Sequence, residues 1–412
     1  MRSPLCIMMV VGVASGCGAR SSLDIATSAG ASSGVARSGG AANTGAPAST
    51  GGTSGGTSTL MTSTLTMIAA GERQTCALFE GGVRCWGDNE NGALGNNSTI
   101  DSAEPVQVQG LTTSVTAIAS GGPHVCAIIN GGLKCWGYNA SGELGDGTAT
   151  NRLTPAQVQG LTAGVTAVAV GLYHTCALVN GGVLCWGSNF GGQLGNNSTN
   201  DSRSPVPVMG LSAGVTTIVA GAYHSCALFG PAVQCWGFNG QGQLGIGSTA
   251  DNHIPVTVHG LSSGVTAIYA TASYHMCALV HDALVCWGDN ESGQLGDGDT
   301  NYSPLPNAVT GLTSGVLAAT AGCRHTCALT VDGAKCWGGN YFGQLGDNST
   351  TDRLLPTEVQ DVGANLESIV TGCYHTCSLV GGHISCWGSN ERGQLGDGTT
   401  MHRSVPVPVI GY

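Results

Sequence analysis

Cysteine is the residue type in this sequence that is best placed to do chemistry, because it recurs in pairs with one fixed spacing. Eight residues separate the two cysteines of each pair, and Trp-Gly always follows the second one. Paired thiols form disulfides or bind metal ions. Zinc sites use shorter CxxC or Cys/His spacings, so this gap favours disulfides. The seven expected disulfides join Cys76 and Cys85, Cys126 and Cys135, Cys176 and Cys185, Cys226 and Cys235, Cys277 and Cys286, Cys327 and Cys336, and Cys377 and Cys386.

Two further cysteines, Cys323 and Cys373, occupy the same position in adjacent repeats. An even set of cysteines with rigid spacing predicts a disulfide framework in an oxidising compartment. We therefore expect an eighth disulfide between these two residues. The alternative is a pair of reduced thiols that bind a metal together with His325 and His375.

Histidine also recurs, two residues before the first cysteine of each pair except the first, where Gln74 stands. A ring of imidazoles suggests a metal site, but recurrence in nearly every repeat favours a structural role, with each histidine hydrogen-bonded to the backbone of an adjacent loop. The six histidines are His124, His174, His224, His275, His325 and His375.

Short acidic loops at Asp146, Asp397 and 297–301 resemble calcium loops, but they lack the full ligand run and its terminal Glu. We interpret them as Asx turns. No nucleophile–base pair or paired carboxylates stand out. The sequence therefore predicts no catalytic residue, no metal and no cofactor.

The elements that position these residues follow a period of 50 residues, with one spacing of 51. A self-similar period of this length indicates one supersecondary unit copied along the chain. Cys176 should face Cys185 across an Asn-Gly hairpin, at a Cα distance of about 4.5–5.5 Å. One unit divides into strands at Val165–Val170, Thr175–Val179, Val183–Trp186 and Pro205–Val208, with a turn at 171–174 and a long loop at 187–204.

Seven copies of four short antiparallel strands predict an all-β protein, a seven-bladed β-propeller of four-stranded antiparallel blades with one hairpin disulfide in each. The first strand is expected near Leu65–Ala70 and the last at Val405–Val409. Two prolines restrict the fourth strand to the edge of its sheet. Closure by packing of the first blade on the last, or by an exchanged strand, stays open.

The repeated segments resemble the regulator of chromosome condensation repeat over residues 65–412. The last repeat shows the motifs as Gly372–His375, Trp387–Asn390 and Gly393–Gly396. Kelch repeats have a similar period but a different glycine and aromatic spacing. The resemblance implies a propeller and several activities: nucleotide exchange on a nuclear GTPase, photoreception, ubiquitin ligase assembly or inhibition of β-lactamases.

Charge narrows these functions, because 24 acidic residues outnumber 13 Lys and Arg, for a net charge of −11. Such a chain has no basic arm to neutralise phosphates. We expect it to bind neither nucleic acid nor a nuclear GTPase. Photoreception in the family uses clustered tryptophans flanked by arginines, whereas here each repeat has one Trp and Arg is scarce.

The N-terminal residues 1–17 read as a lipoprotein-type signal peptide, with a short apolar stretch and a lipobox-like 14–17 segment that ends at Cys17. Ordinary cleavage near Gly16 or Ala19 is the alternative. Residues 18–62 read as a disordered Gly/Ser/Thr/Ala linker, and residues 63–412 as the propeller. We expect a bacterial cell envelope lipoprotein, held to the membrane by a lipid on Cys17, or a secreted protein.

Up-and-down strands place the turn after the first strand and the long loop after the third strand on one face, which we call the loop face. Most Tyr and Phe residues map to it. Tyr and Arg are common in binding hot spots, although packing on the blade beneath would also explain them. The predicted partner-binding residues are Arg73, Tyr138, Tyr173, Phe190, Tyr223, Phe238, Tyr274, Arg324, Tyr341, Phe342, Tyr374 and Arg392.

The sequence thus favours an exported, monomeric, non-catalytic scaffold that binds an extracytoplasmic protein, or a glycan, on the loop face. One alternative is a polysaccharide lyase or hydrolase, which requires acid and base residues that converge at the mouth of the central channel. The other alternative is a structural surface protein.

Overall fold

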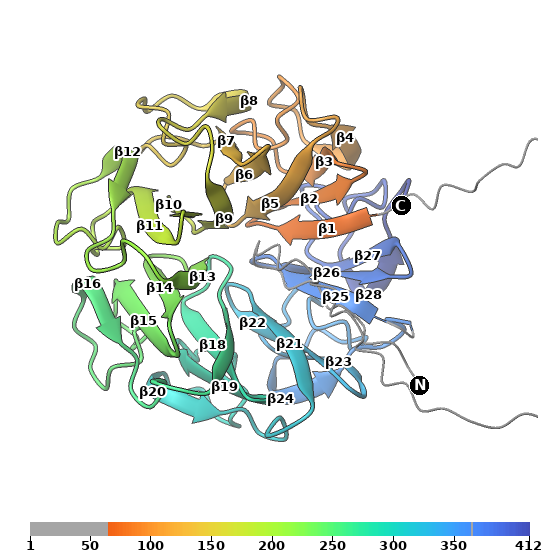
Figure 1. Cartoon of the computed structure of the whole chain (residues 1–412). Helices are drawn as coiled ribbons and strands as arrows, with labels where there is room; N and C mark the ends of the chain where they lie inside the picture. Colours follow the sequence, from red (N-terminus) through yellow and green to blue (C-terminus); the bar gives the residue numbers. More distant parts are fainter. Residues whose placement is uncertain (1–64, 364–365) are drawn as a thin grey trace, which may run out of the picture. The chain divides into compact units, whose positions relative to one another are not determined.

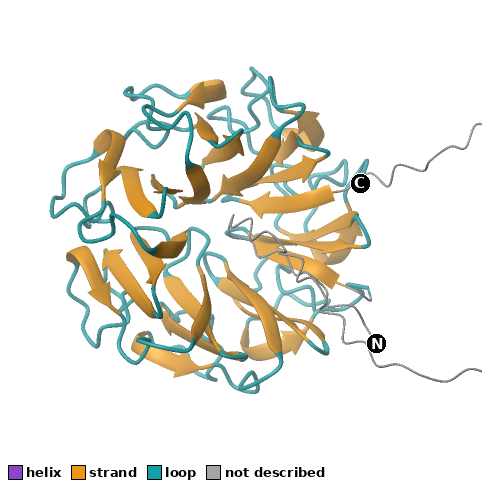
Figure 2. Ribbon diagram, in the orientation of Figure 1, coloured by secondary structure: helices purple, strands orange, loops and turns teal. Residues whose placement is uncertain are grey.

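The computed structural model describes residues 65–363 and 366–412. The predicted signal peptide, the lipidation site Cys17 and the linker lie outside these described residues. Within them, no helix is long and apolar enough to cross a membrane. Figure 2 shows that strands and loops make up the described part of the chain.

Twenty-eight strands form seven four-stranded antiparallel sheets, each built from four consecutive strands. The first strands are β1 (Leu65–Ala70), β5 (Val115–Ser120), β9 (Val165–Val170), β13 (Val215–Ala220), β17 (Val265–Tyr269), β21 (Val316–Ala321) and β25 (Leu366–Thr371). The second strands are β2 (Gln74–Phe79), β6 (His124–Ile129), β10 (His174–Val179), β14 (His224–Phe229), β18 (His275–Val280), β22 (His325–Thr330) and β26 (His375–Val380).

The other two strands of each sheet complete the blade. The third strands are β3 (Gly82–Gly87), β7 (Gly132–Gly137), β11 (Gly182–Gly187), β15 (Ala232–Gly237), β19 (Ala283–Gly288), β23 (Gly333–Gly338) and β27 (His383–Gly388). The fourth strands are β4 (Ser102–Gln107), β8 (Arg152–Gln157), β12 (Ser202–Pro207), β16 (Asn252–Thr257), β20 (Ser303–Ala308), β24 (Arg353–Glu358) and β28 (Arg403–Pro408). First strands such as β1, β5, β9 and β13 line the centre of the ring (Figure 1). The prediction of a seven-bladed propeller is confirmed.

Each blade is closed by the hairpin disulfide that the sequence predicts. Asn180 and Gly181 take positive φ values of 51° and 82°, as a two-residue hairpin turn with the right-handed twist requires. This turn pairs Cys176 with Cys185. The Cα atoms lie 4.1 Å apart in this blade, because opposed residues without a direct ladder hydrogen bond approach most closely.

The other six hairpin disulfides repeat this geometry. All of them have the same Cα separation of 4.1 Å, somewhat shorter than the 4.5–5.5 Å expected from the sequence. The pairing of every hairpin cysteine is therefore confirmed, and only the expected distance is corrected. These six bonds join Cys76 and Cys85, Cys126 and Cys135, Cys226 and Cys235, Cys277 and Cys286, Cys327 and Cys336, and Cys377 and Cys386.

The fourth strand begins earlier than predicted. Strand β12 spans Ser202–Pro207 instead of Pro205–Val208, and β28 spans Arg403–Pro408 instead of Val405–Val409. The ladder is irregular between Cys185 and Gly187 and resumes where Gly187 pairs with Ser202. Pro205, predicted as the first residue of the strand, lies inside it. Proline cannot donate a ladder hydrogen bond, but it is tolerated here because β12 is an edge strand.

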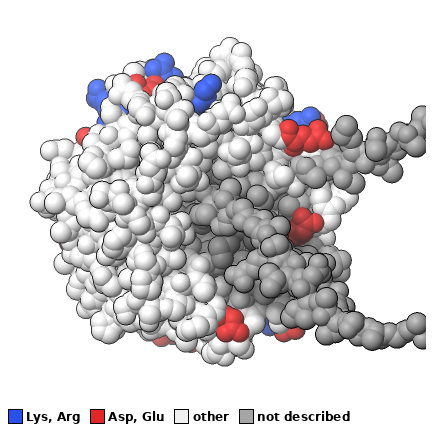
Figure 3. Space-filling view, viewed as in Figure 1, with Lys and Arg blue, Asp and Glu red and all other residues white. Residues whose placement is uncertain are grey.

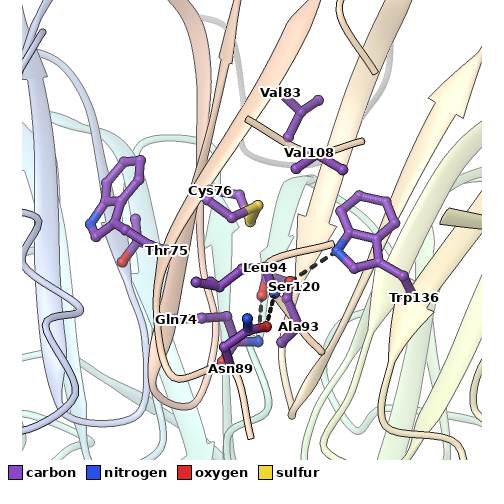
Figure 4. The surroundings of a disulfide bond; sticks show 12 residues. Gln74, Thr75, Cys76, Val83, Asn89, Ala93, Leu94, Val108, Ser120 and Trp136 are labelled. Atoms are coloured by element: carbon purple, nitrogen blue, oxygen red, sulfur yellow. Dashed lines mark hydrogen bonds between the residues drawn. A yellow bond between two sulfur atoms is a disulfide. The ribbon is translucent and has the colours of Figure 1, made fainter. Parts of the chain in front are cut away.

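Adjacent blades are joined by the tryptophan of each repeat. Every one of these indoles is fully buried. Trp136 of blade 2 packs against Val83, Leu94 and Val108 of blade 1, and its Nε1 donates to the Ala93 carbonyl at 2.9 Å (Figure 4). The same bond from Trp86 to the Gln394 carbonyl, also 2.9 Å, joins blade 1 to blade 7. The ring therefore closes by packing, without an exchanged strand.

Candidate functional site

The inner turns of the loop face have one construction in most blades. The Gly171 N–H donates to the His174 carbonyl at 2.9 Å, and a Cβ on Gly171 would collide with the His174 ring. Glycine is therefore required where the turn closes over the imidazole. The residue directly before the histidine, Tyr173 in this blade, is left half-buried at the surface.

The six turn histidines are structural, but their partner differs from the prediction. Nε2 of His174 lies 2.8 Å from the Ser225 hydroxyl of the next blade, not against loop backbone. That hydroxyl donates to the Gln193 carbonyl at 3.0 Å, so it accepts from the imidazole, whose proton is therefore on Nε2. The other pairs with a Thr hydroxyl are His124–Thr175, His275–Thr326, His325–Thr376 and His375–Thr75, at 2.7 to 2.9 Å.

These histidines are neutral. Burial lowers the pKa of His124, His174, His224, His275 and His325 to about 3, and that of His375 to about 4. Among the residues that the structure describes, no group of three or more His, Cys, Asp and Glu is arranged to hold a metal. Five of the six histidines link neighbouring blades by hydrogen bonds, and His224 is the exception.

Two interfaces depart from this link. Between blades 1 and 2, Gln74 replaces the histidine and Val125 replaces the hydroxyl residue, and the Gln74 amide donates instead to Ser120 Oγ and the Gly122 carbonyl, at 3.0 and 2.6 Å. Between blades 4 and 5, His224 is kept but Met276 stands where a hydroxyl is needed. Both ring nitrogens of His224 are buried without a hydrogen-bond partner.

The acidic loops behave as Asx turns. Asp146 accepts from the Thr148 N–H and hydroxyl, and Arg152 Nε reaches its other oxygen at 2.7 Å. Burial would raise the pKa of Asp146, but these hydrogen bonds and the guanidinium outweigh it and lower the pKa. Asp397 is held in the same way by Thr399 and Arg403.

The loop-face aromatics form two clusters. In the first, the ring centroids of Tyr173 and Tyr223 lie 6.0 Å apart and nearly parallel, and Tyr274 lies 5.8 Å from Tyr223. Tyr138 touches Tyr173 at 5.9 Å and Phe190 touches Tyr223 at 4.8 Å. The first cluster also includes Phe238, which lies 6.4 Å from Tyr223.

The second cluster lies on blades 6 and 7. The Phe342 ring lies 4.8 Å from Tyr341 and 5.8 Å from Tyr374. Beside it is a pocket of about 220 Å³ whose lining includes Arg73, Arg392, Phe342 and Tyr374. The structure therefore brings the predicted partner-binding residues together on one face, with Arg324 beside Tyr374 in a second pocket.

That second pocket, at the mouth of the central channel, has a volume of about 460 Å³. We call it the tyrosine bowl. Its lining residues are Tyr173, Tyr223, Tyr274 and Tyr374, with Leu172, Cys323 and Cys373 below them and Glu72, Gln241, Asp289, Glu291 and Arg324 among them.

A disulfide between Cys323 and Cys373 forms part of the bowl, with a Cα separation of 4.4 Å. This is the eighth bond proposed from the sequence. The alternative metal site is not assembled, since both sulfurs are bonded and the Nε2 atoms of His325 and His375 contact Thr376 and Thr75. Because Arg324 and Tyr374 directly follow the two cysteines, the disulfide fixes the spacing of two lining residues.

The carboxylates of the bowl were not among the residues predicted from the sequence. Burial raises the pKa of Glu72 and of Asp289, although Arg73 and Arg324 partly oppose this. Arg324 NH1 lies 3.8 Å from Glu291, and Arg73 Nε lies 3.9 Å from Glu72. Aligning the repeats would have revealed Glu72, since it occupies the position of Leu172 and Cys323.

Charged residues are sparse in this chain. Figure 3 shows one face of the molecule, on which the visible Lys, Arg, Asp and Glu side chains are few and lie toward the rim. Only 9% of the whole chain is charged. Four charged residues line the bowl and three line the neighbouring pocket of about 220 Å³.

Comparison with known proteins gives matches along the repeats. The family described as RCC1-like domain matches residues 129–411, and the regulator of chromosome condensation (RCC1) repeat matches residues 80–128. Human WBSCR16 is 22% identical with a TM-score of 0.72, over 80% of this chain and 93% of that chain. Saccharomyces cerevisiae Prp20p, described with its binding to Gsp1p and histones, is 23% identical with a TM-score of 0.66, over 80% and 84%. At these identities, the two structures establish a shared fold.

Proposed function

This chain belongs to the regulator of chromosome condensation (RCC1) repeat family, and from that premise we propose that it is a non-catalytic scaffold that binds a protein partner on its loop face. Extracytoplasmic location, with a lipid on Cys17 as anchor, is part of the proposal. Eight disulfides within the described residues suggest an oxidising environment.

The observation that carries the proposal is the pair of aromatic clusters on a face where the repeats otherwise diverge. Phe190 and Tyr341 are 55% and 79% exposed, so water covers much of each ring. Large aromatic side chains that partner binding can desolvate dominate interface energetics. Gsp1p and histones belong to the yeast relative; for an oxidising compartment we propose a different, extracytoplasmic protein.

A second candidate is a carbohydrate-active enzyme, because Glu72 and Asp289 line the bowl and burial raises the pKa of both. Carboxyl groups with raised pKa values in a pocket are typical of general acids. Turnover of a polysaccharide that disappears in Glu72→Gln and Asp289→Asn would favour the enzyme over the scaffold.

Cross-linking of the exported protein in an extracytoplasmic fraction tests the scaffold. We expect one stoichiometric partner, whose affinity falls by about 1–3 kcal/mol in Phe190→Ala and in Tyr341→Ala. The matched control is Met209→Ala, which removes a half-exposed apolar side chain. Met209 lies at the end of the blade opposite the loop face, because the N–H of its neighbour Val208 donates to the carbonyl of Val183 beside the hairpin turn. Equal capture by all three variants would contradict the proposal, as would melting temperatures that fall in the face variants while binding persists.

A further inference from the structure

The tyrosine bowl combines two properties that recognise the same chemistry. Its lining includes four tyrosine rings, and its charged residues are three carboxylates against one guanidinium. Aromatic ring faces and carboxylates both attract cations, through the ring quadrupole and through the formal charge.

We propose that the bowl is a subsite for an organic cation, the ammonium or guanidinium group of a Lys or Arg side chain that projects from the protein partner. The inference rests on the proposed binding function and names the chemistry that this part of the loop face takes. The volume of about 460 Å³ lies in the range of about 300–1,000 Å³ that is usual for ligand pockets.

Three of the four tyrosine rings of the bowl lie against one another. Tyr173 and Tyr223 lie nearly parallel at 19°, and Tyr274 meets Tyr223 edge-on at 67°. These three come from neighbouring blades 3, 4 and 5, while Tyr374 comes from blade 7. A side chain that enters the bowl therefore meets aromatic surface from several blades. Energetic gains from such contacts are largest where water is excluded.

Negative charge exceeds positive charge among the residues that line the bowl. Arg324 lies near Glu291, and both side chains are more than half exposed. Asp289 is held mainly by uncharged donors: Gln294 Nε2 donates to its Oδ2 at 2.8 Å, and the Glu291 N–H donates to its Oδ1 at 3.2 Å. Because these donors carry no formal charge, carboxylates still outnumber cations in the bowl. Asp289 itself is 95% buried, since only 5% of its surface is exposed. Glu72 has Arg73 at 3.9 Å but also the like charge of Asp88 nearby. Burial is the main cause of the raised pKa of both carboxyls, and nearby negative charge, Asp88 for Glu72 and Glu291 for Asp289, adds to it.

The geometry is held rigidly. The Cys323–Cys373 disulfide ties the turn that carries Arg324 to the turn that carries Tyr374. Ala272 and Leu172 pack in the same cluster as the two cysteines. A preorganised pocket loses less conformational entropy when its ligand binds.

The neighbouring pocket supplies an internal contrast. It shares Tyr374 with the bowl, but it contains Arg73 and Arg392 with Glu391 as its one carboxylate. A cation should therefore select the bowl. Glu358→Gln is the matched control, since it removes an exposed carboxylate at the end of β24, outside the lining of the bowl.

The experiment titrates the exported, oxidised protein with N-acetyl-lysine methylamide and N-acetyl-arginine methylamide, followed by NMR of the tyrosine rings. The neutral match is the lysine compound acetylated on Nζ. We expect millimolar binding of both cations, at least fivefold weaker binding of the neutral compound, and at least fivefold weakening in the double variant Glu72→Gln/Asp289→Asn. Glu358→Gln should bind the cations unchanged.

Equal binding of the charged and neutral compounds would overturn the inference, and so would cation affinity that the double variant leaves unchanged. Choline is titrated as a third cation. If choline binds tenfold more tightly than the lysine compound, the ligand is a free quaternary ammonium compound and not a side chain of the partner. The proposed function is tested separately by Phe190 and Tyr341, which do not line the bowl. If the protein captures its partner but the bowl does not bind the cations, this inference is wrong and the proposed function stands.

Discussion

The interfaces between blades and the loop face follow opposite rules within the same repeats. At five interfaces a histidine, a hydroxyl and a carbonyl form one chain of hydrogen bonds, and at all seven the tryptophan donates to the equivalent carbonyl of the preceding blade. On the loop face the residue before the histidine changes from Arg73 to Pro123 to Tyr173. Repetition therefore marks what holds the ring together, and divergence marks the face on which we propose that a partner binds.

The interfaces between blades 1 and 2 and between blades 4 and 5 depart from the repeated hydrogen bonds in different ways. At the first, both members of the pair change and Gln74 finds other acceptors. At the second, Met276 alone changes and leaves His224 without a partner. The blade that carries Met276 also has the extra residue in its inner turn, where Ala272 takes a φ of 50°. Divergence near the bowl thus reaches one interface as well.

The largest expected effect is on the interfaces. Trp236→Ala should lower the free energy of unfolding by about 3–5 kcal/mol, because it empties a fully buried site and leaves the Gln193 carbonyl with one donor fewer. Chemical denaturation measures this. Tyr341→Ala, which removes an aromatic of the loop face, is the control, and we expect a change below about 0.5 kcal/mol. Comparable losses would erase the distinction between the two regions.

Disulfides come next, and here the loop face should exceed the hairpins. Replacing Cys323 and Cys373 by alanine opens a loop of about 50 residues and should cost about 4 kcal/mol on the chain-entropy model, against about 3 kcal/mol for Cys176 and Cys185. Denaturant midpoints of the two double variants decide the order. A smaller loss for the longer loop would show that unfolded-state entropy does not govern these bonds.

Glu143 provides a pH-dependent contrast between blades. It occupies in blade 2 the repeat position that Gln193 occupies in blade 3. Its Oε1 is buried without a hydrogen-bond partner. Burial raises its pKa from 4.5 to about 7. The folded state therefore retains a proton that the unfolded chain loses, and stability falls as the pH rises from 4.5 to about 7. At about 1.4 kcal/mol per pKa unit, the loss approaches ~3 kcal/mol.

Glu143→Gln should remove this loss, so its stability gain over the wild type should be absent at pH 4 and complete at pH 8. Gln193→Glu, the reverse change at the same place one blade on, is the matched control and should introduce the pH dependence. Parallel stability curves for Glu143→Gln and the wild type would show that the carboxyl is solvated.

The smallest effect concerns the hydroxyl link. Thr175→Val keeps the side-chain shape but leaves His124 Nε2 unpaired, for a cost of about 1–2 kcal/mol. Thr166→Val is the control, because the Thr166 hydroxyl is exposed and contacts the Leu178 carbonyl at 3.3 Å in the same blade. Thermal unfolding of the two variants should differ. Identical transitions would mean that the imidazole finds another partner, as Gln74 does.

Sequence patterns predicted the features that depend on near neighbours. The Asn180–Gly181 turn sets the Cys176 register, so the hairpin and its disulfide follow from a short run of consecutive residues. The partner of His124 was missed because Thr175 lies 51 residues away. Its signal was present nonetheless: Val125 replaces the hydroxyl residue in the repeat that follows Gln74.

The sequence alone did not predict the bowl. Its acidic residues come from different blades, Glu72 from an inner turn of blade 1 and Asp289 from a long loop of blade 5, and no spacing along the chain brings them together. The early start of β12 was missed because the pairing of Gly187 with Ser202 follows an irregularity in the ladder, and the residue types of 202–204 do not indicate such an irregularity.

The hairpin staples also bear on the order in which the ring assembles. Each joins cysteines nine residues apart, so a single hairpin contains both cysteines that the bond needs. The last interface instead pairs Thr75 with His375, 300 positions away. Until blade 7 arrives, the chain is an open arc whose first blade presents Leu65, Ile68 and Trp86 to water. These separations in sequence place the stapled hairpins early in folding and the closure of the ring by blade 7 last.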